Sequence, residues 1–146
     1  MKFSKATNYA LHSMVFLAVI PSGKTIGVKS LADVQKVSPT YLSKVLTNLV
    51  KAGFVESVTG VNGGYKLIKD PKEITFLDVI QAIEGKASFF QCGLENNIHD
   101  RRNCMIENVM NEAEQKMEEH LTLNTIAGVA EKVNADMITH IHTAAN

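Results

Sequence analysis

The sequence predicts a mainly α-helical fold with one small β hairpin, and three features between residues 30 and 68 indicate it. Ser30 is predicted to be the N-cap of a short helix, whose apolar side carries Leu31, Val34 and Val37. Ser38-Pro39 begins a second helix, because serine accepts a hydrogen bond from an orphan amide and proline fits the first helical position. Asn62-Gly63-Gly64 joins two short β-type runs, 54–58 and 65–68, and supplies the positive φ of a tight hairpin. This order predicts a winged helix-turn-helix.

The second helix, which we expect to stop at Gly53, has one apolar face and one polar face. Its apolar residues are Leu42, Val45, Leu46 and Leu49, at i, i+3, i+4 and i+7. A helix that buries its apolar side in the protein can place its polar side in the major groove of DNA. A hairpin beside it can then contact the DNA backbone. The candidate DNA-binding residues are Lys2, Lys5, Ser38, Thr40, Tyr41, Ser43, Lys44, Thr59, Gly60, Asn62, Gly63 and Gly64.

Charge is divided sharply between the two halves of the chain, although the formal net charge is zero. Residues 1–72 hold ten lysines and three acids, a net +7, and residues 73–146 hold five basic and twelve acidic residues, a net −7. This asymmetry indicates a basic nucleic-acid face and a second part with another task. A solvated lysine face is the ordinary alternative for some of these lysines.

The remaining segments are predicted to be helices, apart from one short strand. Ser4 begins one that runs to Ile20, residues 26–28 form a short strand, and Thr75 opens a helix that Gly85 ends. A long amphipathic helix runs from 104 to 121, and Thr122 caps a last helix to about residue 133. One side of the long helix carries Ile106, Val109, Met110, Ala113 and Met117.

No apolar stretch is long enough to span a membrane, and the N-terminus has no signal-peptide pattern. We therefore expect a cytoplasmic protein whose two cysteines are reduced.

Taken together, the helix-turn-helix, the Gly-Gly-Tyr of the wing and the downstream Thr-Phe-Leu-Asp-Val-Ile pattern resemble the Rrf-type (IscR-like) family of bacterial winged-helix regulators. The resemblance covers most of the chain. It implies a homodimeric transcription regulator, a repressor in many members, that binds palindromic double-stranded DNA. It also implies that the helix from Cys104 is the dimerisation helix. The expected organisation is a DNA-binding domain (1–85), a cysteine-containing sensor loop (86–103) and dimerisation and C-terminal helices (104–146).

Two positions depart from the family pattern. Thr59 stands where the wing commonly has an arginine, so operator contacts are expected to be weaker or differently placed. Cluster-binding members carry three cysteines before the dimerisation helix, and Ile98 replaces the middle one here. Because iron–sulfur clusters need more than two ligands, a stable cluster of the family's type is not expected.

Three hypotheses for Cys92 and Cys104 stay open: a redox-responsive thiol pair, a metal or labile-cluster site with His99 or a partner-chain ligand, and plain reduced cysteines. A protein effector is a further candidate partner.

Enzyme motifs such as HExxH, GxSxG and a glycine-rich loop followed by GK[ST] are absent from the sequence, so we expect no enzyme. Two alternative functions remain, a winged-helix protein-interaction module and a small metal-binding protein.

Overall fold

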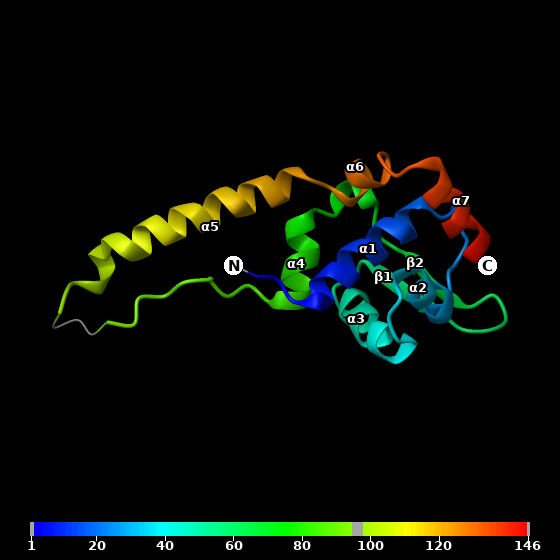
Figure 1. Cartoon of the computed structure of the whole chain (residues 1–146), viewed down its shortest axis with the longest axis horizontal. Coiled ribbons are helices and arrows are strands. Elements are labelled where there is room, and N and C mark those ends of the chain that lie inside the picture. Colours follow the sequence, from blue (N-terminus) through cyan, green and yellow to red (C-terminus); the bar gives the residue numbers. More distant parts are fainter. Residues whose placement is uncertain (1, 95–97, 146) are drawn as a thin grey trace.

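The computed structural model describes residues 2–94 and 98–145, so residues 95–97 of the expected sensor loop lie outside the described residues. A winged-helix body and a long helical arm make up the molecule (Figure 1). The arm consists of α5 (Met105–Leu123) and the loop that leads to it. No described helix is both long and apolar enough to cross a membrane.

The helix-turn-helix consists of α2 (Val28–Gln35) and α3 (Pro39–Lys51), packed below α1 (Lys5–Val19). Ser38 caps α3 as expected, because its Oγ accepts a hydrogen bond from the Tyr41 amide at 3.1 Å. The prediction that Ser30 caps α2 is wrong. The helix begins three residues earlier, after Gly27, whose carbonyl accepts a hydrogen bond from the Leu31 amide.

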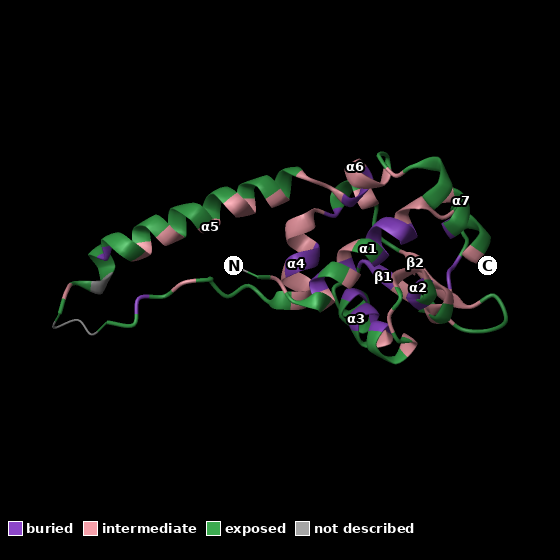
Figure 2. Ribbon diagram, viewed as in Figure 1, coloured by how far each residue is buried: buried purple, intermediate pink, exposed green. Residues whose placement is uncertain are grey.

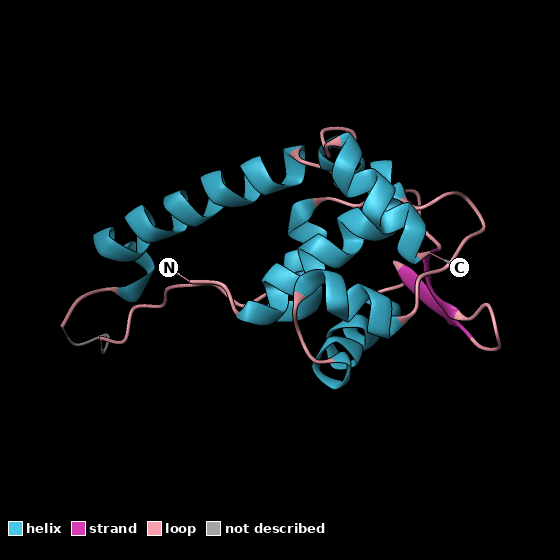
Figure 3. Ribbon diagram, turned by 45° about the vertical axis from the view of Figure 1, so that its right-hand side comes forward, coloured by secondary structure: helices cyan, strands magenta, loops and turns pink. Residues whose placement is uncertain are grey.

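The wing is an antiparallel hairpin of β1 (Val55–Val58) and β2 (Gly64–Leu67), in which Val55 pairs with Leu67 and Val58 with Gly64. It projects beyond the helices at one edge of the body (Figure 3). The predicted strand 26–28 is reduced to one bridge, Ile26 to Tyr65, because α2 starts at Val28.

A short 3-10 turn, η1 (Pro71–Glu73), leads into α4 (Phe76–Glu84), which begins with the predicted Thr75–Asp78 capping box. A second 3-10 turn, η2 (Arg101–Asn103), precedes α5. Thr122 does not cap a helix; its hydroxyl donates to the Glu118 carbonyl within α5. Thr125 caps α6 (Ile126–Ala130) instead, and α7 (Ala135–Ala144) follows in a segment for which no helix was predicted.

The hydrophobic core lies between α1, α3, α4 and the C-terminal helices (Figure 2). The apolar residues predicted for α3 are all buried, as are Met14 of α1, Ile126 of α6 and Ile141 of α7. In contrast, α5 has no buried residue, so the arm contributes little to this core.

Candidate nucleic-acid interface and thiol–histidine cluster

The side of α3 opposite the core is a polar, exposed surface. Thr40, Lys44, Thr47, Asn48 and Lys51 are exposed along it, and Ser43 is half-buried. Asn48 was not predicted from the sequence as a DNA-binding residue, although the side-chain amide of an asparagine can pair with an adenine edge. Tyr41 is only 38% exposed, because its ring packs edge-on against Tyr9 of α1 at 5.7 Å between centroids.

The wing is fixed to the body by a buried threonine that the sequence analysis missed. Thr25 is 5% exposed, and its hydroxyl donates to the Asn62 carbonyl at 2.7 Å. Nearby, the amides of Ile26 and Tyr65 donate to each other's carbonyls. These bonds hold the wing at a set position relative to the start of α2.

Two of the predicted wing residues shape the hairpin. A Cβ on Gly63 would lie 2.5 Å from the Val58 carbonyl oxygen, and one on Gly64, whose φ is +147°, would lie 2.5 Å from that of Ile26. Only glycine fits this close approach. Thr59, Gly60 and Asn62 are exposed at the wing tip and remain the candidates for DNA contact.

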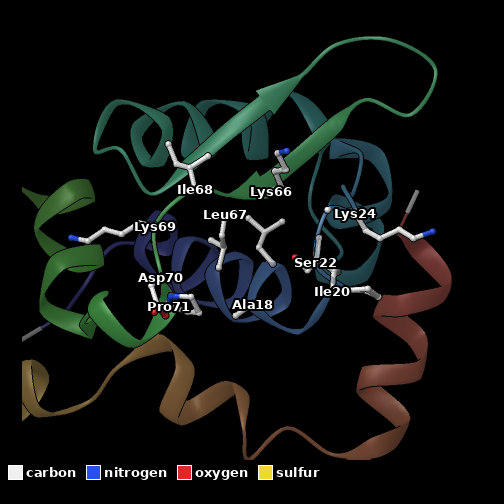
Figure 4. Close-up of a pocket in the computed structure, with 13 residues that line it drawn as sticks. Ala18, Ile20, Ser22, Lys24, Lys66, Leu67, Ile68, Lys69, Asp70 and Pro71 are labelled. Carbon is white, nitrogen blue, oxygen red and sulfur yellow. The ribbon is translucent and has the colours of Figure 1, made fainter.

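Three lysines of the basic half line a pocket of about 360 Å³ between the end of α1 and β2. Their amino groups do not converge on it: Lys24 and Lys69 point to opposite ends of the view (Figure 4). Lys66 forms an ion pair with Glu56 at 3.2 Å. The pocket therefore has no gathered set of cations that would hold an anion.

The N-terminus of α1 is tied to the C-terminus of α4 by a second contact that the sequence did not reveal. One carboxylate oxygen of Glu84 accepts hydrogen bonds from the Ser4 amide, the Ser4 hydroxyl and the Thr7 hydroxyl, at 2.6–2.7 Å. The bonds from Thr7 and Ser4 lower the pKa of Glu84 below its ordinary 4.5. Lys2 and Lys5, both predicted to bind DNA, are exposed near this contact.

The three predicted sensor residues come together at the N-terminal end of α5, the end of the arm away from the winged-helix body (Figure 1). The Cys92 Sγ lies 3.4 Å from the His99 Nε2, and the donor atoms of Cys92, His99 and Cys104 all lie within 4.8 Å of one another. Both cysteines are free thiols and buried, and His99 is half-buried. The His99 Nδ1 is buried without a hydrogen-bond partner among the described residues.

Cys104 also caps α5, because its Sγ accepts from the Glu107 amide at 3.5 Å. This bond and the one from His99 lower the pKa of the Cys104 thiol from 9.0 to about 7. A substantial thiolate fraction therefore exists near neutral pH, and thiolate is the form that ligates metals and reacts with oxidants.

An iron–sulfur cluster of the family's three-cysteine kind does not fit these residues. Ile98, at the middle position, is 67% exposed and offers no ligand atom. The three donors that are present converge on one point. A cluster, in contrast, distributes its ligands over more than one iron.

The apolar stripe of α5 is exposed along the arm's outer half. Ile106 is 66% and Val109 65% exposed, whereas Met110 and Met117 are half-buried. Nearer the body α5 contacts α4, and Met117 and Leu121 line a pocket of about 290 Å³ together with Leu77 and Ile80 of α4. Part of the predicted dimerisation stripe thus packs on its own chain, and the outer part is left without cover.

Comparisons with known proteins relate the chain to a family of transcription regulators. Residues 3–132 match the model of the Rrf2 family, described as an iron-dependent transcriptional regulator. The helix-turn-helix-type transcriptional regulator NsrR of Bacillus licheniformis is 34% identical over 115 residues, which are 77% of this chain and 80% of that protein. The helix-turn-helix-type protein YffB of Lactococcus lactis is 34% identical over 138 residues, 90% of this chain and 88% of its own.

Two solved structures share the fold. The oxidized form of Staphylococcus aureus CymR superposes with a TM-score of 0.75 at 27% identity, and covers 92% of this chain and 100% of its own. IscR of T. potens superposes with a TM-score of 0.74 at 28% identity, and covers 93% and 90%.

Proposed function

Because the chain belongs to the Rrf2 family of transcription regulators rather than to an enzyme family, we propose that it is a sequence-specific DNA-binding repressor acting as a homodimer on a palindromic operator. One observation carries this proposal: the polar, lysine-bearing face of α3 is exposed beside a wing that Thr25 holds in place. Such a helix reads base edges in the major groove while the wing contacts the backbone.

Charge supports the same assignment. Residues 1–72, which carry the net +7, include α2, α3 and the wing, and residues 28–67 alone hold five lysines and two acids, a net +3. Contacts between lysines and phosphates supply most of the sequence-independent binding energy. A surface for docking another protein has less reason to be so uniformly cationic.

The exposed stripe of α5 supports the homodimer. An apolar surface on a helix without buried residues is stabilised when a second copy covers it, by about 25 cal/mol per Å² of apolar area. Two copies related by a twofold axis would present two α3 helices to half-sites about 34 Å apart.

We propose further that the state of Cys92, His99 and Cys104 regulates DNA binding. The cluster lies at the N-terminus of α5, so a change in it acts on the first turn of the dimerisation helix. Tilting that helix would change the separation of the two α3 helices.

Selection of bound sequences from a random duplex pool tests the DNA proposal. The expected result is an inverted repeat whose half-site centres lie about one helical turn apart. Transcription in vitro from a promoter overlapping the selected site should fall when the protein is added. A pool without enrichment at moderate salt would contradict sequence-specific binding, and increased transcription would contradict repression.

A further inference from the structure

The arrangement of the three sensor side chains matches the ligand sphere of a single metal ion. In a tetrahedral zinc site, bonds of about 2.3 Å to sulfur and about 2.0 Å to nitrogen place a sulfur and a nitrogen ligand roughly 3.5 Å apart. The Cys92 Sγ and the His99 Nε2 are 3.4 Å apart. Two sulfur ligands of such an ion lie roughly 3.8 Å apart. The Cys104 Sγ lies within 4.8 Å of both other donors, so small side-chain adjustments close the triangle.

We propose that Cys92, His99 and Cys104 bind one zinc-type divalent ion, through two thiolates and the Nε2 of the imidazole. Ion binding at this nitrogen requires the ring proton on Nδ1, which is the nitrogen without a partner among the described residues. The mixed sulfur and nitrogen donor set suits zinc and ferrous iron, and zinc binds more tightly in the Irving–Williams order.

Three protein ligands leave one position of a tetrahedral ion for water or an exchangeable ligand. Beside the cluster lies a pocket of about 470 Å³, lined by all three ligands together with apolar residues such as Phe90, Leu94 and Ile106. The open position therefore has room for a small molecule, so the site can respond to a ligand as well as to the metal itself.

The site is joined directly to the arm's helix. The same Cys104 sulfur that would bind the metal accepts the Glu107 amide and caps α5. A bound ion would fix the first turn of α5 to residues 92 and 99 on the other side of the loop. The regulatory meaning of this link rests on the proposed function, whereas the metal site itself does not.

Titration of the reduced, metal-free full-length protein with Co²⁺ under anaerobic conditions tests the site. Tetrahedral Co²⁺ with thiolate ligands gives intense ligand-field bands and sulfur-to-metal charge-transfer bands. We expect both to saturate at one ion per chain and to disappear when Zn²⁺ is added. A parallel competition with Fe²⁺ shows which of the two metals binds more tightly.

Single-ligand variants assign the donors. Cys92→Ser, Cys104→Ser and His99→Gln should each weaken Co²⁺ binding by more than about 100-fold, since even the loss of a residue that only hydrogen-bonds to a metal ligand alters metal affinity by about 10–100-fold. His120→Gln, a substitution at an exposed histidine of α5, is the matched control and should bind like the wild type. Circular dichroism checks that each variant is folded.

Any of three results would overturn the proposal. The first is a Co²⁺ spectrum without thiolate charge transfer, and the second is a spectrum that His99→Gln leaves unchanged. The third is retention of two irons with acid-labile sulfide per chain after anaerobic supply of iron and sulfide, which would indicate a cluster. None of these readouts involves DNA, so loss of the metal site and loss of the DNA-binding proposal are distinguishable.

Discussion

Lys44 lies in the middle of the exposed face of α3, where a single long cation reaches either a base or a phosphate. If it reads a base, Lys44→Ala should cost about 1–3 kcal/mol and relax specificity at one operator position. If it binds a phosphate, affinity should fall for all sequences, and the salt slope should decrease by about one. Titrations of the selected site and its single-base variants at several salt concentrations separate the two, and unchanged affinity would place Lys44 outside the interface.

Glu84 gives a pH-dependent prediction at the same scale. Its pKa is lowered below 4.5 in the folded chain, so its contribution to stability is present above about pH 4.5 and is lost as pH falls through the lowered value. Glu84→Ala should therefore destabilise the protein at pH 7, by about 1 kcal/mol because the site is exposed. The difference from wild type should shrink below pH 4.5, as measured by urea unfolding at matched protein concentration.

The control for Glu84 is Glu112→Ala, which removes an exposed carboxylate of α5. It should change stability little at either pH. A Glu84→Ala deficit that stays constant down to pH 3 would show that the three hydrogen bonds do not depend on the ionised carboxylate.

Residues whose partners are near in sequence were predictable, and residues with distant partners were not. Ser38 bonds the amide three residues later, and that pattern is visible in the chain. Thr25 bonds a residue 37 positions away, and Glu84 bonds residues 77 and 80 positions away. No local pattern marks such pairs. The sensor residues lay between these cases: their types were recognisable, but their convergence depended on how the loop folds back.

At the scale of the element, the position of the wing depends on a backbone conformation at Gly64 that only glycine adopts without strain. Gly64→Ala would force a Cβ to 2.5 Å from the Ile26 carbonyl at a φ of +147°. We expect a loss of about 1–3 kcal/mol in stability and a loss of operator affinity, because the wing must move away from α2. Thermal unfolding and DNA titration measure the two effects.

Gly93→Ala is the matched control for the wing, because a Cβ at Gly93 meets nothing within 4 Å. It should leave stability close to wild type. It is not a control for DNA affinity, because Gly93 follows Cys92 and lines the pocket beside the sensor residues. Equal stability of Gly64→Ala and Gly93→Ala would mean that the contact with Ile26 does not restrict the wing.

The helix α5 carries the prediction about assembly. Val109 is 65% exposed in the single chain, so Val109→Glu should leave the fold intact. In a dimer it would place like charges near the twofold axis and remove them from water. We expect a monomer with reduced operator affinity, measured by sedimentation velocity. Asn111→Glu adds the same charge at an exposed position two residues away and should remain dimeric; two unchanged dimers would move the interface elsewhere.

Sequence periodicity was a good guide to elements and a poor guide to their ends. The faces of α3 and α5 follow directly from apolar spacing, and both helices are present. The C-terminal elements were misjudged because Thr122 and Thr125 are both plausible caps, and only the backbone bonds of Ile126 to Ile74 and of Phe76 to Asn124 select the second. The helix α7 was missed, although it buries Ile141 completely and places the His142 imidazole against the Val19 carbonyl.

At the scale of the whole molecule, the sensor cluster and the two α3 helices are predicted to be coupled. A disulfide between Cys92 and Cys104 would close a loop with eleven intervening residues, which restricts the unfolded chain by about 3 kcal/mol in the entropy model. A tenfold change in affinity needs about 1.4 kcal/mol. If about half of the disulfide's effect differs between two arrangements of α5, it reaches that value. On this basis we expect at least a tenfold difference in operator affinity between the reduced, metal-free protein and protein that is oxidised or metal-loaded.

The double variant Cys92→Ser, Cys104→Ser is the control for this coupling, and its affinity should be the same in all conditions. Fluorescence anisotropy with the selected operator measures both proteins. Equal affinity of the wild type in every state would mean that the signal enters by another route, such as a protein effector bound to the acidic second half.

The pairing of Thr75 with Thr125 has a consequence for how such proteins diversify. Just before α4 and just after α5, the backbone amides of Phe76 and Ile126 donate hydrogen bonds to the carbonyls of Asn124 and Ile74. The two ends of the segment that includes the arm are therefore held together by the body. Each doubling of the length of a segment between two such fixed ends costs only about 0.6 kcal/mol in loop-closure entropy. The loop before α5 can therefore change in length and sequence during evolution, and acquire different sensor residues, while α2, α3 and the wing stay the same.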